Sequence, residues 1–284
     1  MTPIGSLTSQ WGEGPLWHND RLYYVDIESH LVVAFDPSAY TEQTSNIGER
    51  VGCVVPRASG GLVIAGDSGF HFLDPASGTI TPITDPEPNL ADNRFNDGKC
   101  DPAGRFWAGT ISLIKNTGTA NLYRLDPDLT AHHILPGITN SNGIVWNQDA
   151  DTMFYIDTPT QKIDAFDFDN TTGAITNRRT VIDTSALSGN PDGMAIDEND
   201  HLWVAMCHGG TVHHFDPAAS SPNTPLTTLE VPAIEVTAPA FGGPNLTDLY
   251  ITTGRSKNAQ GELDGRLFLT QPGPKGTPAT PFAG

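Results

Sequence analysis

An apolar, β-rich segment recurs along this chain at nearly even spacing. Six such segments are spaced by 40, 44, 47, 49 and 47 residues, and they begin near Leu22, Leu62, Phe106, Met153, Leu202 and Leu249. Each leads through a turn into a second strand, which often ends in an Asp-Pro tag such as AFDP or FLDP. A period of roughly 40 to 50 residues with about four strands is typical of a propeller blade. The spacing therefore predicts an all-β protein, a six-bladed β-propeller.

We predict that the six periods form one domain that fills the chain. The predicted blades span residues 13–50, 51–92, 93–138, 139–186, 187–234 and 235–284. A β-sandwich with a second domain is the alternative, but no linker of biased composition interrupts the period. The tail PGPKGTPATPFAG either closes the ring or hangs loose.

An acid or amide precedes a glycine at one place in most of the repeats. The four pairs are Glu13-Gly14, Asp97-Gly98, Asn142-Gly143 and Asp192-Gly193. We take the apolar segments as the first strands of the blades, which line the channel, so these residues would lie at one mouth of it. Their oxygens would then converge, as hard divalent cations require.

The same place lacks an acid or amide in two repeats. Blade 2 has Val51-Gly52-Cys53, and blade 6 has Ala238-Pro239-Ala240. The fold therefore does not require oxygen there, which favours a functional role for the others. The alternative is that each pair is an ordinary turn dipeptide, because Asp-Gly and Asn-Gly are common in turns.

The charge of the chain excludes several partners. The formal net charge is −18, with only 15 Lys and Arg. Such a surface disfavours nucleic acid and anionic membrane, and no run of 18 apolar residues exists to span a bilayer. The N-terminal residues lack the basic flank and apolar stretch of a secretory signal. We predict cytoplasmic localisation.

The three cysteines are scattered and do not form a CxxC pair. Cys53, Cys100 and Cys207 each lie in or near an apolar run. We interpret them as buried free thiols in a reducing compartment. This interpretation agrees with the predicted cytoplasmic localisation.

Other candidate groups carry weaker signals. Arg94, in the polar stretch NRFNDG, offers a planar fork for a substrate oxygen, although a surface ion pair is the alternative. His208 follows an apolar strand and is a candidate to reach the pocket. The adjacent pairs His132-His133 and His213-His214 would point to opposite faces of a strand and cannot share a metal. No GxSxG elbow, P-loop or HExxH motif is present.

Several long stretches resemble one known family. They are GEGPLW with LYYVDI, NRFNDGKCDPAGRFWAGT, SNGIVWNQDADTMFYIDT, PDGMAIDENDHLWVA and the final FGG with LYITT. In order and spacing they are similar to the family of senescence marker protein 30 (regucalcin), gluconolactonases and luciferin-regenerating proteins. The resemblance spans nearly the whole chain.

The resemblance implies a six-bladed propeller with one divalent metal in its channel and, in many members, hydrolysis of sugar lactones. It places the metal ligands on Glu13, Asn142 and Asp192. It places Arg94 and Asn96 where substrate is held or beside the metal. Asp97 matches an acid of the family whose role is less defined. One departure is the short connection SLIKNTGT, residues 112–119, where vertebrate members have a longer loop that helps to cover the substrate.

We therefore predict a metal-dependent lactonase that opens sugar lactones to aldonic acids. Asp192 or Asp97 would act as general base, and Arg94 and Asn96 would bind substrate. Ca, Mg or Mn suits oxygen ligands, and Zn or Fe also accepts three protein ligands with water. The expected partner is a small-molecule lactone, and the protein would be a monomer or small homo-oligomer.

Two other functions are left open by these residues. The first is hydrolysis of another ester or an organophosphate by the same metal centre. The second is a non-catalytic calcium- or ligand-binding propeller, which would bind without turnover.

Overall fold

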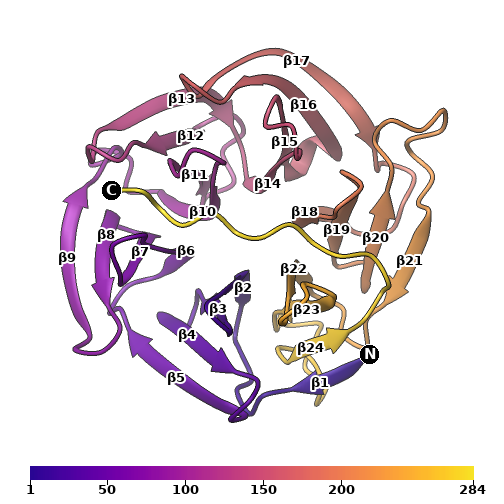
Figure 1. Ribbon diagram of the computed structural model, residues 1–284, viewed down its shortest axis with the longest axis horizontal. Helices are drawn as coiled ribbons and strands as arrows, with labels where there is room; N and C mark the ends of the chain where they lie inside the picture. The colour runs from indigo at the N-terminus through magenta and orange to yellow at the C-terminus, as the bar shows by residue number, and fades with distance from the viewer.

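The protein is a ring of six four-stranded antiparallel sheets around a central channel (Figure 1). The computed structural model describes residues 1–284, and its one helix is the short 3-10 turn η1 (Thr158–Thr160). The predicted all-β, six-bladed propeller is thereby confirmed. No helix of this structure has the length and apolar character that a membrane crossing needs.

The first three sheets follow one another in chain order. The strands of the first are β2 (Gly12–His18), β3 (Arg21–Asp26), β4 (Leu31–Asp36) and β5 (Thr41–Asn46). Those of the second are β6 (Val51–Pro56), β7 (Leu62–Gly66), β8 (Gly69–Asp74) and β9 (Thr79–Thr84). Those of the third are β10 (Asn93–Cys100), β11 (Phe106–Ser112), β12 (Ala120–Leu125) and β13 (Ala131–Ile138).

Three further sheets complete the ring, and the sixth sheet contains both the first and the last strand of the chain. The strands of the fourth are β14 (Ser141–Trp146), β15 (Thr152–Asp157), β16 (Lys162–Asp169) and β17 (Ala174–Asp183). Those of the fifth are β18 (Asn190–Ile196), β19 (Leu202–Cys207), β20 (Thr211–Phe215) and β21 (Thr227–Glu230). Those of the sixth are β22 (Val236–Gly242), β23 (Asp248–Thr253), β24 (Leu267–Thr270) and β1 (Thr2–Ile4).

The innermost strands were misidentified from the sequence. The apolar segments beginning near Leu22 or Leu202 form the second strand of each sheet, and β2, β6, β10, β14, β18 and β22 line the channel (Figure 1). The second strands are buried on both faces and therefore read as apolar runs. The innermost strands contain glycine, proline and polar residues, which hid them. The predicted site residues consequently lie within the channel-lining strands and not before them.

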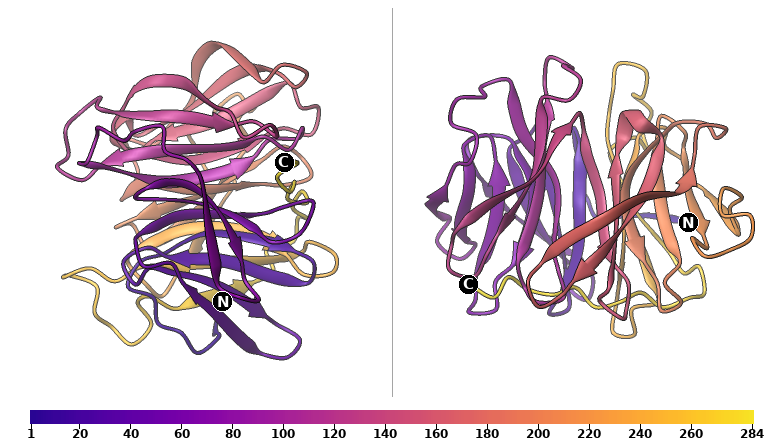
Figure 2. Two further views of the ribbon diagram at one scale, coloured as in Figure 1. Left: turned by 90° about the vertical axis from the view of Figure 1, so that its left-hand side faces the viewer. Right: turned by 90° about the horizontal axis from the view of Figure 1, so that it is seen from above.

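The ring is closed by the N-terminal strand. β1 pairs with β24, with Thr2 opposite Leu269, and this completes the sixth sheet. The C-terminal tail instead crosses one end of the channel (Figures 1 and 2). Phe282 anchors it, because its amide donates to the Pro56 carbonyl and its own carbonyl accepts from the Ala58 amide. Of the two fates predicted for the tail, neither is correct.

The apolar core lies between neighbouring sheets. Tryptophans on equivalent second strands, Trp107 and Trp203, are fully buried, and each indole N–H donates to a buried aspartate that caps the preceding turn. All three cysteines are buried and free, as predicted. This packing fixes the innermost strands, which carry the candidate site.

Candidate metal centre and active site

Every channel-lining strand carries a β-bulge at the same level. The pairing with the second strand slips between Glu13 and Leu16 on β2, and at corresponding places on the other five strands. Bulges re-aim side chains and are frequent beside active sites. The bulge is thus a property of the fold, and the residue placed in it decides the chemistry.

Strand pairing shows which residues are equivalent around the ring. Trp17 pairs with Leu22 and Ile196 with Leu202, so the residues four positions earlier, Glu13 and Asp192, correspond. Applying the same count to every sheet defines what we call the hub ring. It consists of Glu13, Gly52, Asn96, Asn142, Asp192 and Thr237.

Asp97 is not a member of the hub ring, which corrects the repeat alignment. Cys100 pairs with Phe106, so Asn96 is the third-sheet member and Asp97 lies one residue further on. Counting from the second strands could not show this, because the turns after the innermost strands differ in length. At the position of Asp97 the other sheets have only small residues, namely Gly14, Cys53, Gly143, Gly193 and Ala238.

These small residues allow neighbouring innermost strands to approach closely. A Cβ on Gly193 would lie 2.4 Å from the Ala238 Cβ, and one on Gly143 would lie 2.9 Å from the Asp192 carbonyl oxygen. Blade packing therefore explains the glycines of the acid-glycine pairs, whereas it does not explain the acids.

The carboxylates of the hub ring are buried and close enough to repel. Glu13 and Asp192 are 4% and 6% exposed. Burial, and then Asp192 and Asp97, raise the pKa of Glu13 well above its usual range. Burial, and then Asp97, raise the pKa of Asp192 to about 8, while the Cys207 thiol and the Asn142 amide oppose this shift by hydrogen bonding. The structure thus brings Glu13, Asn142, Asp192 and Asp97 into one electrostatic group.

The donor set fits a divalent cation. Glu13, Asn142 and Asp192 offer two carboxylates and an amide oxygen, and none of the ion pairs in the structure involves Glu13 or Asp192. Buried carboxylates that raise one another's pKa are stabilised when a cation lies among them. Oxygen ligands suit hard cations such as Ca²⁺, Mg²⁺ and Mn²⁺. These residues would therefore hold the ion that the sequence predicts.

Arg94 and Asn96 extend the site along β10. The Arg94 Nη1 donates to the Phe95 carbonyl and to Asn96 Oδ1, both at 2.8 Å, whereas its buried Nε has no acceptor. The Asn96 Nδ2 donates to the Ser141 carbonyl at 2.7 Å and lies 3.4 Å from Asn142 Oδ1. Arg94 is therefore buried and fixed in place, and it keeps an unused donor.

Thr158 is a site residue that the sequence analysis missed. Its hydroxyl accepts from Asn142 Nδ2 at 2.8 Å and donates to the Pro191 carbonyl at 2.9 Å. With its amide nitrogen occupied in this way, Asn142 would offer a cation its Oδ1, which also accepts a long hydrogen bond from Asn96 Nδ2 at 3.4 Å. The only sequence signal is the position of Thr158 directly after β15.

A second missed group is the buried Glu235 beside His208. The His208 Nδ1 lies 2.5 Å from Glu235 Oε2, and the same oxygen is 3.5 Å from the Cys207 thiol. His208 is exposed on its outer side and adopts a positive φ of 64°. It thus adjoins the hub through Cys207, and it pairs with Glu235.

The adjacent histidines His213 and His214 have different partners, and His214 lies with Asp197 and His201 in a group whose ligand atoms are all within 4.8 Å of one another. His213 contacts Thr228, and His214 contacts Asp197, so the two rings have different partners. Asp197 is fully engaged, since it also accepts from the Trp203 indole and from two turn amides. Asp101 makes the equivalent bonds in the third sheet, which identifies this arrangement as structural.

The fold and the site define a class of protein, a six-bladed propeller with buried carboxylate and amide oxygens at its hub. The chain belongs to the SMP-30/gluconolactonase/LRE-like family, whose sequence pattern matches residues 11–255. It is 39% identical to regucalcin of Danio rerio, over 96% of this chain and 95% of that protein. It is 37% identical to "Putative sugar lactone lactonase YvrE" of Bacillus subtilis (strain 168), with the same coverage.

Solved structures show the same architecture. A luciferin-regenerating enzyme superimposes with a TM-score of 0.91 at 30% identity, covering 97% of this chain and 96% of the other. A calcium-binding protein, regucalcin, from Agrobacterium tumefaciens superimposes with a TM-score of 0.89 at 24% identity, covering 99% and 95%. The second comparison supports the fold alone.

Proposed function

We propose that this protein is a divalent-cation-dependent lactonase that opens sugar lactones to aldonic acids. Glu13, Asn142 and Asp192 would hold the cation. When bound there, it supplies Lewis acidity toward a carbonyl oxygen and toward water. Membership of a family that includes gluconolactonases, and similarity to a protein named as a sugar lactone lactonase, support the substrate class.

The observation that carries the proposal is the composition of the hub ring. Two sheets place Gly52 and Thr237 in it, so the bulge does not require a carboxylate. The Thr237 hydroxyl is used structurally, because it donates to the Gly12 carbonyl. Glu13 and Asp192 are nevertheless kept in the hub despite burial and mutual repulsion. Destabilising groups of this kind cluster at functional sites.

The remaining residues supply orientation and proton transfer. Arg94, whose Nε lacks an acceptor, and the neighbouring Asn96 would contact hydroxyl or ring oxygens of the lactone. The Asp97 side chain has one hydrogen bond in the structure, which one of its oxygens accepts from the Gly98 amide at 2.7 Å. Asp97 or Asp192 accepts the proton of the attacking water. The same carboxyl group would then return the proton to the alkoxide as the ring C–O bond breaks, so the product is a hydroxy acid.

A pH-indicator assay on chelator-treated protein tests the proposal. Several aldonolactones are offered, and Ca²⁺, Mg²⁺, Mn²⁺, Zn²⁺ and Fe²⁺ are added back singly. We expect acid release only with a cation. If Asp97 is the base, Asp97→Asn should lose turnover and keep cation binding. If Asp97→Asn keeps turnover, and Asp192→Asn loses both turnover and cation binding, the base is assigned to Asp192.

Two outcomes would favour the alternatives. Turnover of phosphotriesters or simple esters in preference to aldonolactones would identify a different hydrolase. Saturable cation binding without turnover of any member of the panel would identify a binding protein. The short connection 112–119, in which Leu113 and Ile114 are exposed, would cover the substrate less than a longer loop.

A further inference from the structure

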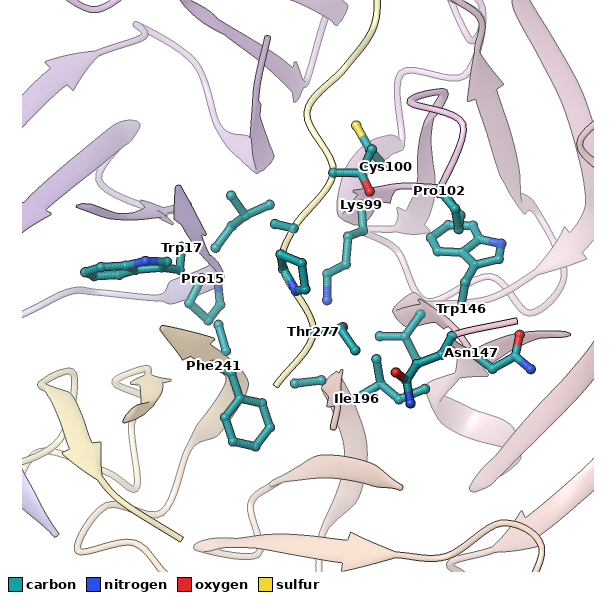
Figure 3. Close-up of a pocket in the computed structure, with 18 residues that line it drawn as sticks. Pro15, Trp17, Lys99, Cys100, Pro102, Trp146, Asn147, Ile196, Phe241 and Thr277 are labelled. Atoms are coloured by element: carbon teal, nitrogen blue, oxygen red, sulfur yellow. The ribbon is translucent and has the colours of Figure 1, made fainter. Parts of the chain in front are cut away.

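A second cavity lies at the other end of the channel. It has a volume of about 320 Å³, and the ends of five channel-lining strands form its walls (Figure 3). Ten of its 18 lining residues are hydrophobic, including Trp17, Trp146, Ile196 and Phe241. Small-molecule sites have this size and mostly apolar lining, together with a few polar groups that converge.

Lys99 is the one cationic side chain of the cavity. Figure 3 shows it extending into the space between Pro15, Thr277 and Ile196. Its Nζ donates to the Met194 carbonyl at 3.0 Å, which is its only hydrogen bond in the structure. An ammonium group has three donors, so two remain for a ligand or for water.

The fold does not require a lysine at this position. Strand pairing makes Lys99 equivalent to Leu16, Val55, Val145, Ala195 and Ala240, which are all apolar. Lys99 is therefore a departure from the repeat within a chain that has only 15 Lys and Arg. Burial lowers the pKa of Lys99, and Asp97 opposes this shift. Lys99 forms no ion pair within 4.0 Å, so structural pairing does not account for it.

The C-terminal tail forms the outer wall of this cavity. Its first part is fixed to the fifth and sixth sheets, because the Lys275 carbonyl accepts from the Glu198 amide and the Gly276 amide donates to the Leu246 carbonyl. Its last part is fixed by Phe282, which is fully buried. Between these anchors, residues 277–280 line the cavity. The wall is therefore held in place at both ends.

We propose that this cavity is a second ligand site, distinct from the hub, that binds a small aromatic or aliphatic carboxylate. The apolar body of the ligand would lie among the tryptophans, phenylalanine and isoleucine, and its carboxylate would pair with Lys99. A carboxylate accepts from an ammonium in a strong, charge-assisted bond. The net charge of the protein is −18, so most of its surface repels anions. Lys99 is therefore the group that would make this cavity selective for a carboxylate.

Calorimetric titration with 2-naphthoate tests this proposal, with the neutral 2-naphthamide as the matched ligand. We expect saturable 1:1 binding of 2-naphthoate, and at least tenfold weaker binding of 2-naphthamide. Lys99→Met, which keeps the length of the side chain and removes its charge, should weaken 2-naphthoate by a similar factor. Ala279→Trp, in the tail, should abolish binding of both compounds by filling the cavity.

The hub serves as the control. Glu13→Gln should leave 2-naphthoate binding unchanged, since Glu13 does not line the cavity. Absence of saturable binding to the unaltered protein would overturn the proposal. So would binding that Lys99→Met and Ala279→Trp leave intact, or binding that Glu13→Gln removes. If Lys99→Met does not fold, the comparison of naphthoate with naphthamide and the Ala279→Trp variant decide the question.

Discussion

The two ends of the same channel-lining strands carry opposite chemistry. At the hub ring, β2, β14 and β18 present Glu13, Asn142 and Asp192. Four residues further along, the same strands present Trp17, Trp146 and Ile196 to an apolar cavity. Both ends share one backbone geometry, repeated six times. The repeat therefore fixes where side chains point, and their chemistry varies independently at each level.

The strand β10 differs from the other five at both levels. It has Asp97 where the others have glycine, cysteine or alanine, and Lys99 where they have aliphatic residues. A small cavity that both residues line lies between the hub and the larger cavity. On β10, therefore, two candidate functional residues are departures from the repeat.

The largest difference between the two ends should appear on β18. Asp192→Asn should reduce lactone hydrolysis by at least about 100-fold, the scale of losing one charge-stabilising group. Ile196→Val, on the same strand, should keep turnover and lower the free energy of unfolding by about 0.5–1.5 kcal/mol. Initial rates and urea denaturation measure the two effects. Equal losses of turnover in both variants would show that the hub has no special role.

A smaller effect is expected from Arg94. Arg94→Lys keeps the charge but loses the planar fork, so we expect kcat/KM for aldonolactones to fall by about tenfold or more. Cation affinity, measured by calorimetry, should remain close to that of the unaltered protein, because Arg94 would not be a ligand. A variant with normal kcat/KM would remove Arg94 from the substrate site.

The close approach of innermost strands gives a prediction about stability alone. Gly193→Ala should destabilise the protein by about 1–3 kcal/mol, since its Cβ would lie 2.4 Å from the Ala238 Cβ. Gly261→Ala is the matched control, because its Cβ would meet only the Asp264 carboxyl group, with Oδ2 at 3.2 Å, and no backbone atom. Chemical denaturation should separate them clearly. Similar midpoints for the two variants would contradict the packing role of Gly193.

The burial of Asp192 also predicts a pH dependence of stability. Asp192 has a pKa of about 8 in the folded protein and an ordinary value of 3.8. Between these values the folded state holds more protons, so the free energy of unfolding should fall as pH rises from about 4 to about 8. Urea midpoints of chelator-treated protein measure this trend. Added Ca²⁺ or Mn²⁺ should reduce it, and Asp192→Asn should flatten it. A midpoint that climbs with pH across this window would contradict the burial of an uncompensated carboxylate.

The sequence revealed the fold through the second strands and the site through its oxygens. The second strands, such as Leu202–Cys207, are completely buried and give a clear apolar period. The innermost strands give none, because packing against neighbours requires Gly52 or Gly193 there. The repeat pattern selected Asp97 for the position that Asn96 occupies in the hub ring. The correct choice depends on the lengths of the turns between the first two strands, which no local pattern encodes.

Other features depend on contacts between distant residues. Thr158 joins the site only through hydrogen bonds to Asn142 and Pro191. The apolar cavity is assembled from five strands and the tail, so no single segment announces it. Glu13 lies in the hub ring, and Arg94 lies two residues before its member Asn96. The roles assigned to Glu13 and Arg94 remain predictions.

The pairing of β1 with β24 joins the start of the chain to a strand near its end within the sixth sheet. Five sheets are each made from consecutive residues, and they can assemble while the ribosome is still at work. The sixth sheet is complete only when Thr2–Ile4 pairs with Leu267–Thr270. A fusion or a proteolytic cut that displaces those three N-terminal residues would therefore expose the edge of β24 and leave the other five sheets complete.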